Sequence, residues 1–118
     1  MAKNAIPDPL ERRHLVEREL EPSRSLAIAE AYLAAGRSLE AVAFLKKAKA
    51  EARLEALWQE AASSGDAFLL REVALALGRE PSPSDWRALA DAAAAAGRDR
   101  YAGEGRRQVE RLANRTGG

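Results

Sequence analysis

Residues 23–50, SRSLAIAEAYLAAGRSLEAVAFLKKAKA, decide the fold of this chain. They predict a helix over residues 23–35, a turn at Gly36 and a second helix over residues 38–50. A glycine suits this turn because the residue that follows a helix often adopts a positive φ angle. Large apolar side chains recur at helical spacing on the second helix, at Leu39, Val42 and Leu45. The stretch therefore predicts two antiparallel helices that form a hairpin.

The same arrangement recurs twice further along the chain. A second hairpin is predicted over residues 52–77 around Gly65, and a third over residues 84–113 around Gly97. The three glycines follow one another at intervals of about 30 residues, which is typical of stacked helical hairpins. Because one hairpin cannot bury its apolar face alone, neighbouring hairpins are expected to pack together.

Start and stop signals divide the rest of the chain. Pro7 and Pro9 end an irregular leader, Asp8 can cap a first helix that runs to about Glu19, and Pro22 ends that helix. We expect one domain, divided into a leader with the N-terminal helix (1–21), repeat 1 (22–50), a degenerate repeat 2 (51–79), repeat 3 (80–113) and a flexible tail (114–118).

Capping residues are expected before the other helices. A side-chain oxygen at such a position accepts from a free backbone N–H of the first turn. The candidates are Ser23, Ser38, Asp66, Ser84 and Asp99, with Ser82 as an alternative start for the sixth helix. The last helix is the weakest, since Gly103 and Gly105 each cost about 1 kcal/mol relative to Ala. It is expected to start late, near Glu104, or to fray.

The composition indicates an all-α protein. Of 118 residues, 27 are Ala and 15 are Leu, and only seven are β-branched, so a sheet is disfavoured. The absence of Cys excludes disulfides, thiolate metal sites and Cys nucleophiles. The net charge is +1, and no run of about 20 apolar residues is present to span a membrane. We expect a soluble cytoplasmic protein.

The first hairpin resembles a full tetratricopeptide repeat. It reads Ile28-Ala29-x-x-Tyr32-x-x-x-Gly36 and then Glu40-Ala41-x-x-x-Leu45-x-x-Ala48. The third hairpin repeats part of the pattern through Trp86, Leu89-Ala90, Ala93, Gly97 and Ala102, whereas the second keeps only Leu57, Ala61 and Gly65. The resemblance covers residues 23–110 and implies a short α-solenoid of about seven helices, an N-terminal helix plus three stacked hairpins. The alternative is a HEAT-like or other right-angled helical array.

No catalytic constellation stands out. His14 is the only His, so a His-based metal site is excluded. Ser63-Ser64 and the Ser82/Ser84 pair are better explained by helix ends and caps than by nucleophilic catalysis. Gly103-Glu104-Gly105 lacks the spacing of a phosphate-binding loop. We therefore predict a protein that is not an enzyme, with no catalytic residue, no metal site and no cofactor.

The resemblance implies a concave groove, lined by the first helix of each hairpin, as the binding surface. Its residues are Leu26, Glu30 and Leu33 from the first hairpin, Glu55 and Gln59 from the second, and Arg87 and Asp91 from the third. Such a groove is mildly acidic with an apolar end. It predicts a protein–protein interaction adaptor that binds a peptide or helix carrying basic residues beside an apolar anchor.

Two alternatives stay open. The small-residue run of residues 92–96 suits either a tight helix seam or a homo-oligomer contact, which would make the chain a self-assembling structural subunit. The Arg-rich C-terminal helix can instead contact nucleic-acid phosphates through Arg107, Arg111 and Arg115. The near-neutral charge and the scarcity of aromatic residues there disfavour nucleic acid. A membrane role is disfavoured because this helix has only Val109 and Leu112 as large apolar residues.

Overall fold

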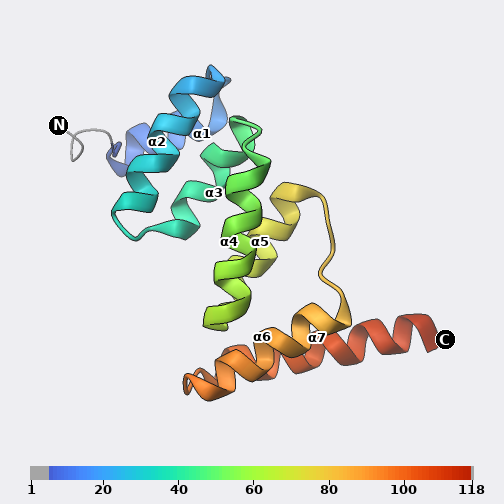
Figure 1. The fold of residues 1–118 in the computed structure, drawn as a ribbon. Coiled ribbons are helices and arrows are strands. Elements are labelled where there is room, and N and C mark those ends of the chain that lie inside the picture. Colours follow the sequence, from blue (N-terminus) through green and yellow to red (C-terminus); the bar gives the residue numbers. More distant parts are fainter. Residues whose placement is uncertain (1–5, 118) are drawn as a thin grey trace. The chain divides into compact units, whose positions relative to one another are not determined.

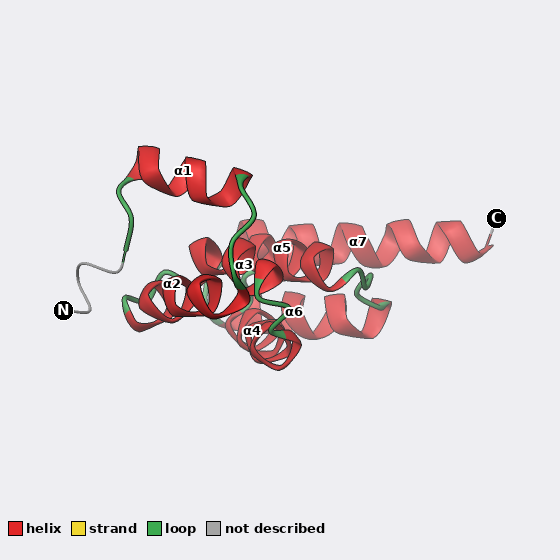
Figure 2. Cartoon of the chain, turned by 90° about the horizontal axis from the view of Figure 1, so that it is seen from above, coloured by secondary structure: helices red, strands yellow, loops and turns green. Residues whose placement is uncertain are grey.

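The computed structural model describes residues 6–117, which form seven α-helices and no strand (Figures 1 and 2). The predicted all-helical class is thus confirmed. The helices are α1 (Pro9–Glu17), α2 (Pro22–Ala34), α3 (Ser38–Lys47), α4 (Glu51–Ser64), α5 (Ala67–Leu77), α6 (Pro83–Ala95) and α7 (Asp99–Gly117). The chain divides into two compact units. The first ends at Leu54 and the second begins at Glu55, so the division falls within α4.

The first unit is built on the α2–α3 hairpin. The two helices pack against each other around Gly36, whose φ of 74° confirms the predicted turn. Tyr32 and Phe44 are fully buried, and their rings stack with centroids 5.9 Å apart. Helix α3 ends three residues before the predicted Ala50, because Lys49 adopts a positive φ of 55° that ends the helical hydrogen-bonding pattern.

Helix α1 is attached to this hairpin through one arginine. The Arg12 guanidinium lies 5.6 Å from the centroid of each ring of the Tyr32–Phe44 pair, which is cation–π distance. Its Nη2 donates to the backbone carbonyl oxygen of Glu40 at 3.0 Å. Together with the buried Leu15, these contacts hold α1 to α2 and α3.

The second unit is built around α6. Helices α6 and α7 run side by side (Figure 1), and α7 also contacts α5. Trp86, Leu89, Ala90 and Ala93 of α6 are buried, as are Ala102 and Leu112 of α7. This unit therefore has its own apolar core, to which every turn of α6 contributes.

Gly105 sits where α7 crosses α6, and this position overturns the expectation for the last helix. A Cβ on Gly105 would lie 3.0 Å from both the carbonyl oxygen of Trp86 and the Cβ of Ala90. The absence of a side chain therefore permits the two helices to approach closely. The packing outweighs the weak helix propensity, and α7 is continuous from Asp99 to Gly117 instead of starting near Glu104 or ending at the predicted tail.

Helix starts agree with the predictions in part. Asp8 accepts from the N–H of Glu11 at 2.8 Å and Asp66 accepts from that of Leu69 at 3.0 Å, so both predicted caps are confirmed. Ser82 rather than Ser84 caps α6 and forms a capping box with Asp85. Three other predicted caps are wrong because their helices begin at or before them: Ser23, Ser38 and Asp99 lie inside the first turns of α2, α3 and α7.

Candidate functional site

The groove residues predicted in the first unit lie on α2. Leu26, Glu30 and Leu33 are each half-buried. The Glu30 carboxylate is 3.0 Å from Nη2 of Arg53, an ion pair within the same unit. The carboxylate is thus already engaged by an arginine of this chain.

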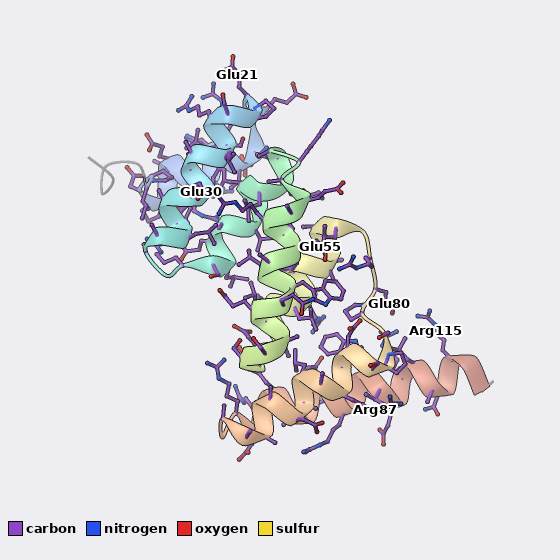
Figure 3. The ribbon with its side chains drawn as sticks, viewed as in Figure 1. Glu21, Glu30, Glu55, Glu80, Arg87 and Arg115 are labelled. Carbon is purple, nitrogen blue, oxygen red and sulfur yellow. The ribbon has the colours of Figure 1, made fainter. Side chains whose placement is uncertain are left out.

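The groove residues predicted in the second unit lie on α4 and α6. Gln59, Arg87 and Asp91 are exposed, and Arg87 (labelled in Figure 3) lies one helical turn from Asp91 on α6. The predicted groove draws on residues of both units, and it stays a prediction.

Glu55 is bound by an arginine of its own unit. Arg79 Nη1 and Nη2 donate to its two carboxylate oxygens at 2.7 and 2.9 Å. The same guanidinium lies 4.2 Å from the centroid of the Trp58 ring. These hydrogen bonds lower the pKa of the Glu55 carboxyl below its ordinary value. Arg79 therefore joins the residues that follow α5 to α4, and Glu55 serves this structural contact.

The three arginines predicted to contact phosphate all pair with carboxylates. Arg107 Nη2 is 2.9 Å from Glu104, while Arg111 Nη2 and Arg115 Nη1 are 2.8 and 3.3 Å from Glu80 (Figure 3 labels Glu80 and Arg115). Their hydrogen bonds lower the pKa values of both glutamates. The C-terminal arginines are thus arranged around two acidic side chains.

An apolar pair on α5 is exposed. Phe68 is 52% exposed and Leu75 is 72% exposed. They are seven residues apart, so they lie on one face of the helix two turns apart. Single exposed apolar residues are common on protein surfaces, whereas these two share one face of the helix.

Two clefts flank this pair, both lined by α5 and α7. The cleft at Phe68 has a volume of about 340 Å³ and the cleft at Leu75 about 580 Å³. The first is lined by residues that include Arg71, Tyr101, Glu104 and Arg107, and the second by Arg71, Ala74, Pro81, Trp86 and Arg111. Arg71 lines both clefts and reaches Glu104 at 3.4 Å. We call the two clefts together the α5–α7 groove.

Trp86 contributes an unused hydrogen-bond donor to the core beside this groove. Its side chain lines the Leu75 cleft and is only 2% exposed. Its indole Nε1 is buried and has no hydrogen-bond partner within residues 6–117. Burying a donor without an acceptor costs free energy. A hydrogen bond from Nε1 to an acceptor that reached it would therefore be more stabilising than the same bond at an exposed site.

Sequence reasoning missed the α5–α7 groove. The signal was nonetheless present in AFLLREVALAL, residues 67–77, which carries apolar side chains around its whole circumference. A helix buried on one side cannot cover all of them, and α5 buries Leu69, Leu70 and Val73 while leaving Phe68 and Leu75 outside.

Comparison of the chain with protein families, with curated proteins and with solved structures finds no match. The tetratricopeptide resemblance therefore stays a prediction. Across residues 6–117, no helix has both the length and the apolar composition needed to cross a membrane. In the same part of the chain, no three His, Asp or Glu side chains cluster closely enough to hold a metal ion.

Proposed function

We propose that this chain is a non-enzymatic protein–protein interaction module that docks an amphipathic helix of a partner protein in the α5–α7 groove. The observation that carries the proposal is the exposed pair Phe68 and Leu75, two turns apart beside two clefts. Helices that bind in grooves present apolar side chains at i and i+7 in the same way. The proposal keeps the cytoplasmic location and the tetratricopeptide-like stacking of hairpins predicted from the sequence.

The proposed groove differs from the concave groove that the resemblance implies. It lies wholly within the second unit, on α5 and α7. In the concave set, the carboxylates of Glu30 and Glu55 are already paired with Arg53 and Arg79. The exposed apolar pair Phe68 and Leu75 favours the α5–α7 groove, and the concave set remains the alternative docking surface.

The two other candidate functions have weaker support. Nucleic-acid binding would use the same arginines, Arg107, Arg111 and Arg115, but phosphate contacts would leave the exposed apolar pair Phe68 and Leu75 uncovered. Self-assembly through the alanine run has little apolar area available, because Ala94, Ala95 and Ala96 are small and exposed. Both remain distinguishable outcomes of the test.

Site-specific photo-crosslinking tests the docking surface. A benzoylphenylalanine at position 68 or 75 of the full chain is irradiated in lysate of the source cells, and the crosslinked segment is mapped by mass spectrometry. The proposal expects both positions to capture one segment, which binds as a synthetic peptide and becomes helical by circular dichroism. Positions 87 and 91 on α6 are the controls and should not capture it.

The other outcomes are equally informative. Capture from positions 87 and 91 alone would move the docking surface to the concave groove. Crosslinks between two copies of this chain would favour self-assembly. Crosslinks from none of the four positions, or to a segment that does not bind as a peptide, would overturn the proposal.

A further inference from the structure

Resting on the proposed function, we infer that the helix docked in the α5–α7 groove is acidic. It places apolar residues on Phe68 and Leu75 and carboxylates along the edge that faces α7. Charge complementarity carries this inference. The concave groove predicts a basic partner instead, so the two surfaces predict partners of opposite charge.

Two of the three acidic side chains in the groove are each shared by two arginines. Glu104 accepts from Arg71 at 3.4 Å and from Arg107 at 2.9 Å. Glu80 is approached by Arg111 and Arg115 in the same manner. Two carboxylates therefore neutralise only half the charge of four guanidinium groups. The remaining positive charge attracts further carboxylates.

The lining of the groove also carries more arginines than acidic residues. Five arginines line the two clefts, against three acidic residues: Arg71, Arg79, Arg100, Arg107 and Arg111 against Glu80, Asp99 and Glu104. Arg79 is balanced by Glu55 from outside the lining. Excess charge of one sign beside an apolar pair selects a partner of opposite sign and raises its association rate.

The spacing along α5 predicts where the partner carries its acidic residue. Arg71 lies between Phe68 and Leu75 in the sequence and lines both clefts. A partner helix with apolar residues at i and i+7 spans about 10.5 Å, the distance of two turns on α5. A Glu or Asp at i+3 or i+4 of that helix then falls beside Arg71 and Arg107. More than half of the side chain of each of these two arginines is exposed to solvent.

A protein helix fits the groove better than a nucleic acid. Nucleic-acid strands are held by phosphate contacts and by stacking of bases on aromatic rings. The groove lining carries the aromatic rings of Phe68 and Tyr101, but it also carries the aliphatic side chains of Ala74, Leu75 and Pro81, which an apolar helix face contacts and a nucleic acid does not need. The apolar pair and the arginine surplus together match an acidic amphipathic helix.

Three matched peptides test the charge of the partner. Each is a helix of about 18 residues with leucines at i and i+7. Glu, Gln or Lys occupies the remaining positions of the groove-facing edge. Binding to the full-length ¹⁵N-labelled chain is followed by two-dimensional NMR. We expect the Glu peptide to shift amides of α5 and α7, to bind at least about tenfold more tightly than the Lys peptide, and to weaken as salt rises.

Charge reversal on α7 provides the matched control. Arg107→Glu should weaken binding of the Glu peptide by about fivefold or more and improve binding of the Lys peptide. Arg106→Glu changes the neighbouring residue by the same charge, but Arg106 is exposed and lines neither cleft. It should leave both affinities within about twofold. Both side chains are exposed, so the variants are expected to fold.

The outcomes separate the inference from the proposed function. Equal binding of all three peptides in the groove would overturn the acidic partner and leave docking intact. The same conclusion would follow if the Lys peptide bound best, or if no peptide bound while positions 68 and 75 still crosslinked one helical segment. Displacement of the Glu peptide by duplex RNA, with the same dependence on Arg107, would overturn the inference in favour of phosphate binding.

Discussion

A Cβ atom built on Gly65 would lie 2.4 Å from the Cα atom of Ala93 and 2.8 Å from its Cβ. The turn between α4 and α5 thus rests directly on the backbone of α6. Gly65 also has a φ of 73°, which L side chains rarely adopt. Two separate physical requirements therefore demand glycine at this one position.

Gly65→Ala should destabilise the protein strongly. The positive φ costs about 1 kcal/mol for a residue with a Cβ, and overlap with α6 adds about 1–3 kcal/mol. Urea denaturation followed by circular dichroism measures the change in the free energy of unfolding. We expect a loss of about 3 kcal/mol.

Gly97→Ala is the matched control for this substitution. Gly97 has a nearly identical φ of 75°, but a Cβ there would meet no atom within 4 Å. Gly97→Ala should therefore lower the free energy of unfolding only by the cost of the positive φ, about 1 kcal/mol. Equal losses for the two variants would show that Gly65 does not pack closely on α6.

Gly105→Ala and Gly103→Ala should change stability in opposite directions. Both lie in α7, where alanine raises helix propensity by about 1 kcal/mol. At Gly103 the added Cβ would meet only the flexible end of Arg107 at 3.4 Å, so the variant should be stabilised by about 0.5–1 kcal/mol. At Gly105 it would press on α6, and a net loss of about 1–2 kcal/mol is expected.

Thermal unfolding of the two single variants checks this pair. A gain in melting temperature for both would mean that α6 and α7 tolerate a wider separation than the structure shows.

Ser82→Ala should cost about 1 kcal/mol of stability. The Ser82 hydroxyl oxygen accepts from the N–H of Asp85 at 3.1 Å, and the Asp85 carboxylate accepts from the N–H of Ser82 at 2.8 Å. Ser84→Ala removes an exposed hydroxyl from the first turn of the same helix and should change stability by less than about 0.5 kcal/mol. Chemical denaturation of both variants decides which serine caps α6.

The Glu80 carboxyl should titrate below its ordinary pKa. Hydrogen bonds from Arg111, which has the larger effect, and from Arg115 favour its charged form and lower its pKa from 4.5. A group whose pKa is lower in the folded state stabilises the fold at pH values above the unfolded pKa. That stabilisation is lost as the pH falls through the folded pKa. The contribution of Glu80 should therefore be present at neutral pH and decline below about pH 4.5.

Carboxyl ¹³C chemical shifts of Glu80 measure this titration directly. Arg111→Met should return the pKa toward the ordinary value, because it removes the first of the two hydrogen-bond donors. Glu60→Gln is the control, since Glu60 is exposed and has no ion pair within residues 6–117. It should leave the Glu80 titration unchanged. An ordinary pKa for Glu80 in the unmodified chain would contradict the ion pairs with α7.

The helices and turns were predictable because their signals are local. Gly36, Gly65 and Gly97 mark the three hairpin turns in the sequence, and all three adopt positive φ. The predicted caps Ser23, Ser38, Ser84 and Asp99 failed because each of them lies inside the first turn of its helix and not before it. In α2 and α6, a proline with its fixed φ occupies the first helical position.

The candidate surface depended on contacts between distant residues. Arg71 meets Glu104 and Arg111 meets Glu80, pairs that are 33 and 31 residues apart. No spacing rule relates such pairs, so the sequence showed the arginines of the C-terminal helix but not their placement beside α5. The exposure of Phe68 and Leu75 likewise depends on which side of α5 its neighbours cover.

Helix α6 is held between two glycines, Gly65 on Ala93 and Gly105 on Ala90. Both alanines are therefore fixed in size, since a larger side chain at either would push a neighbouring backbone away. Ala94, Ala95 and Ala96 are exposed and carry no such restriction. In a population of diverging sequences, positions 90 and 93 should stay small while the alanines beyond them drift freely. The uniform alanine run thus combines one constrained site with several that are free to change.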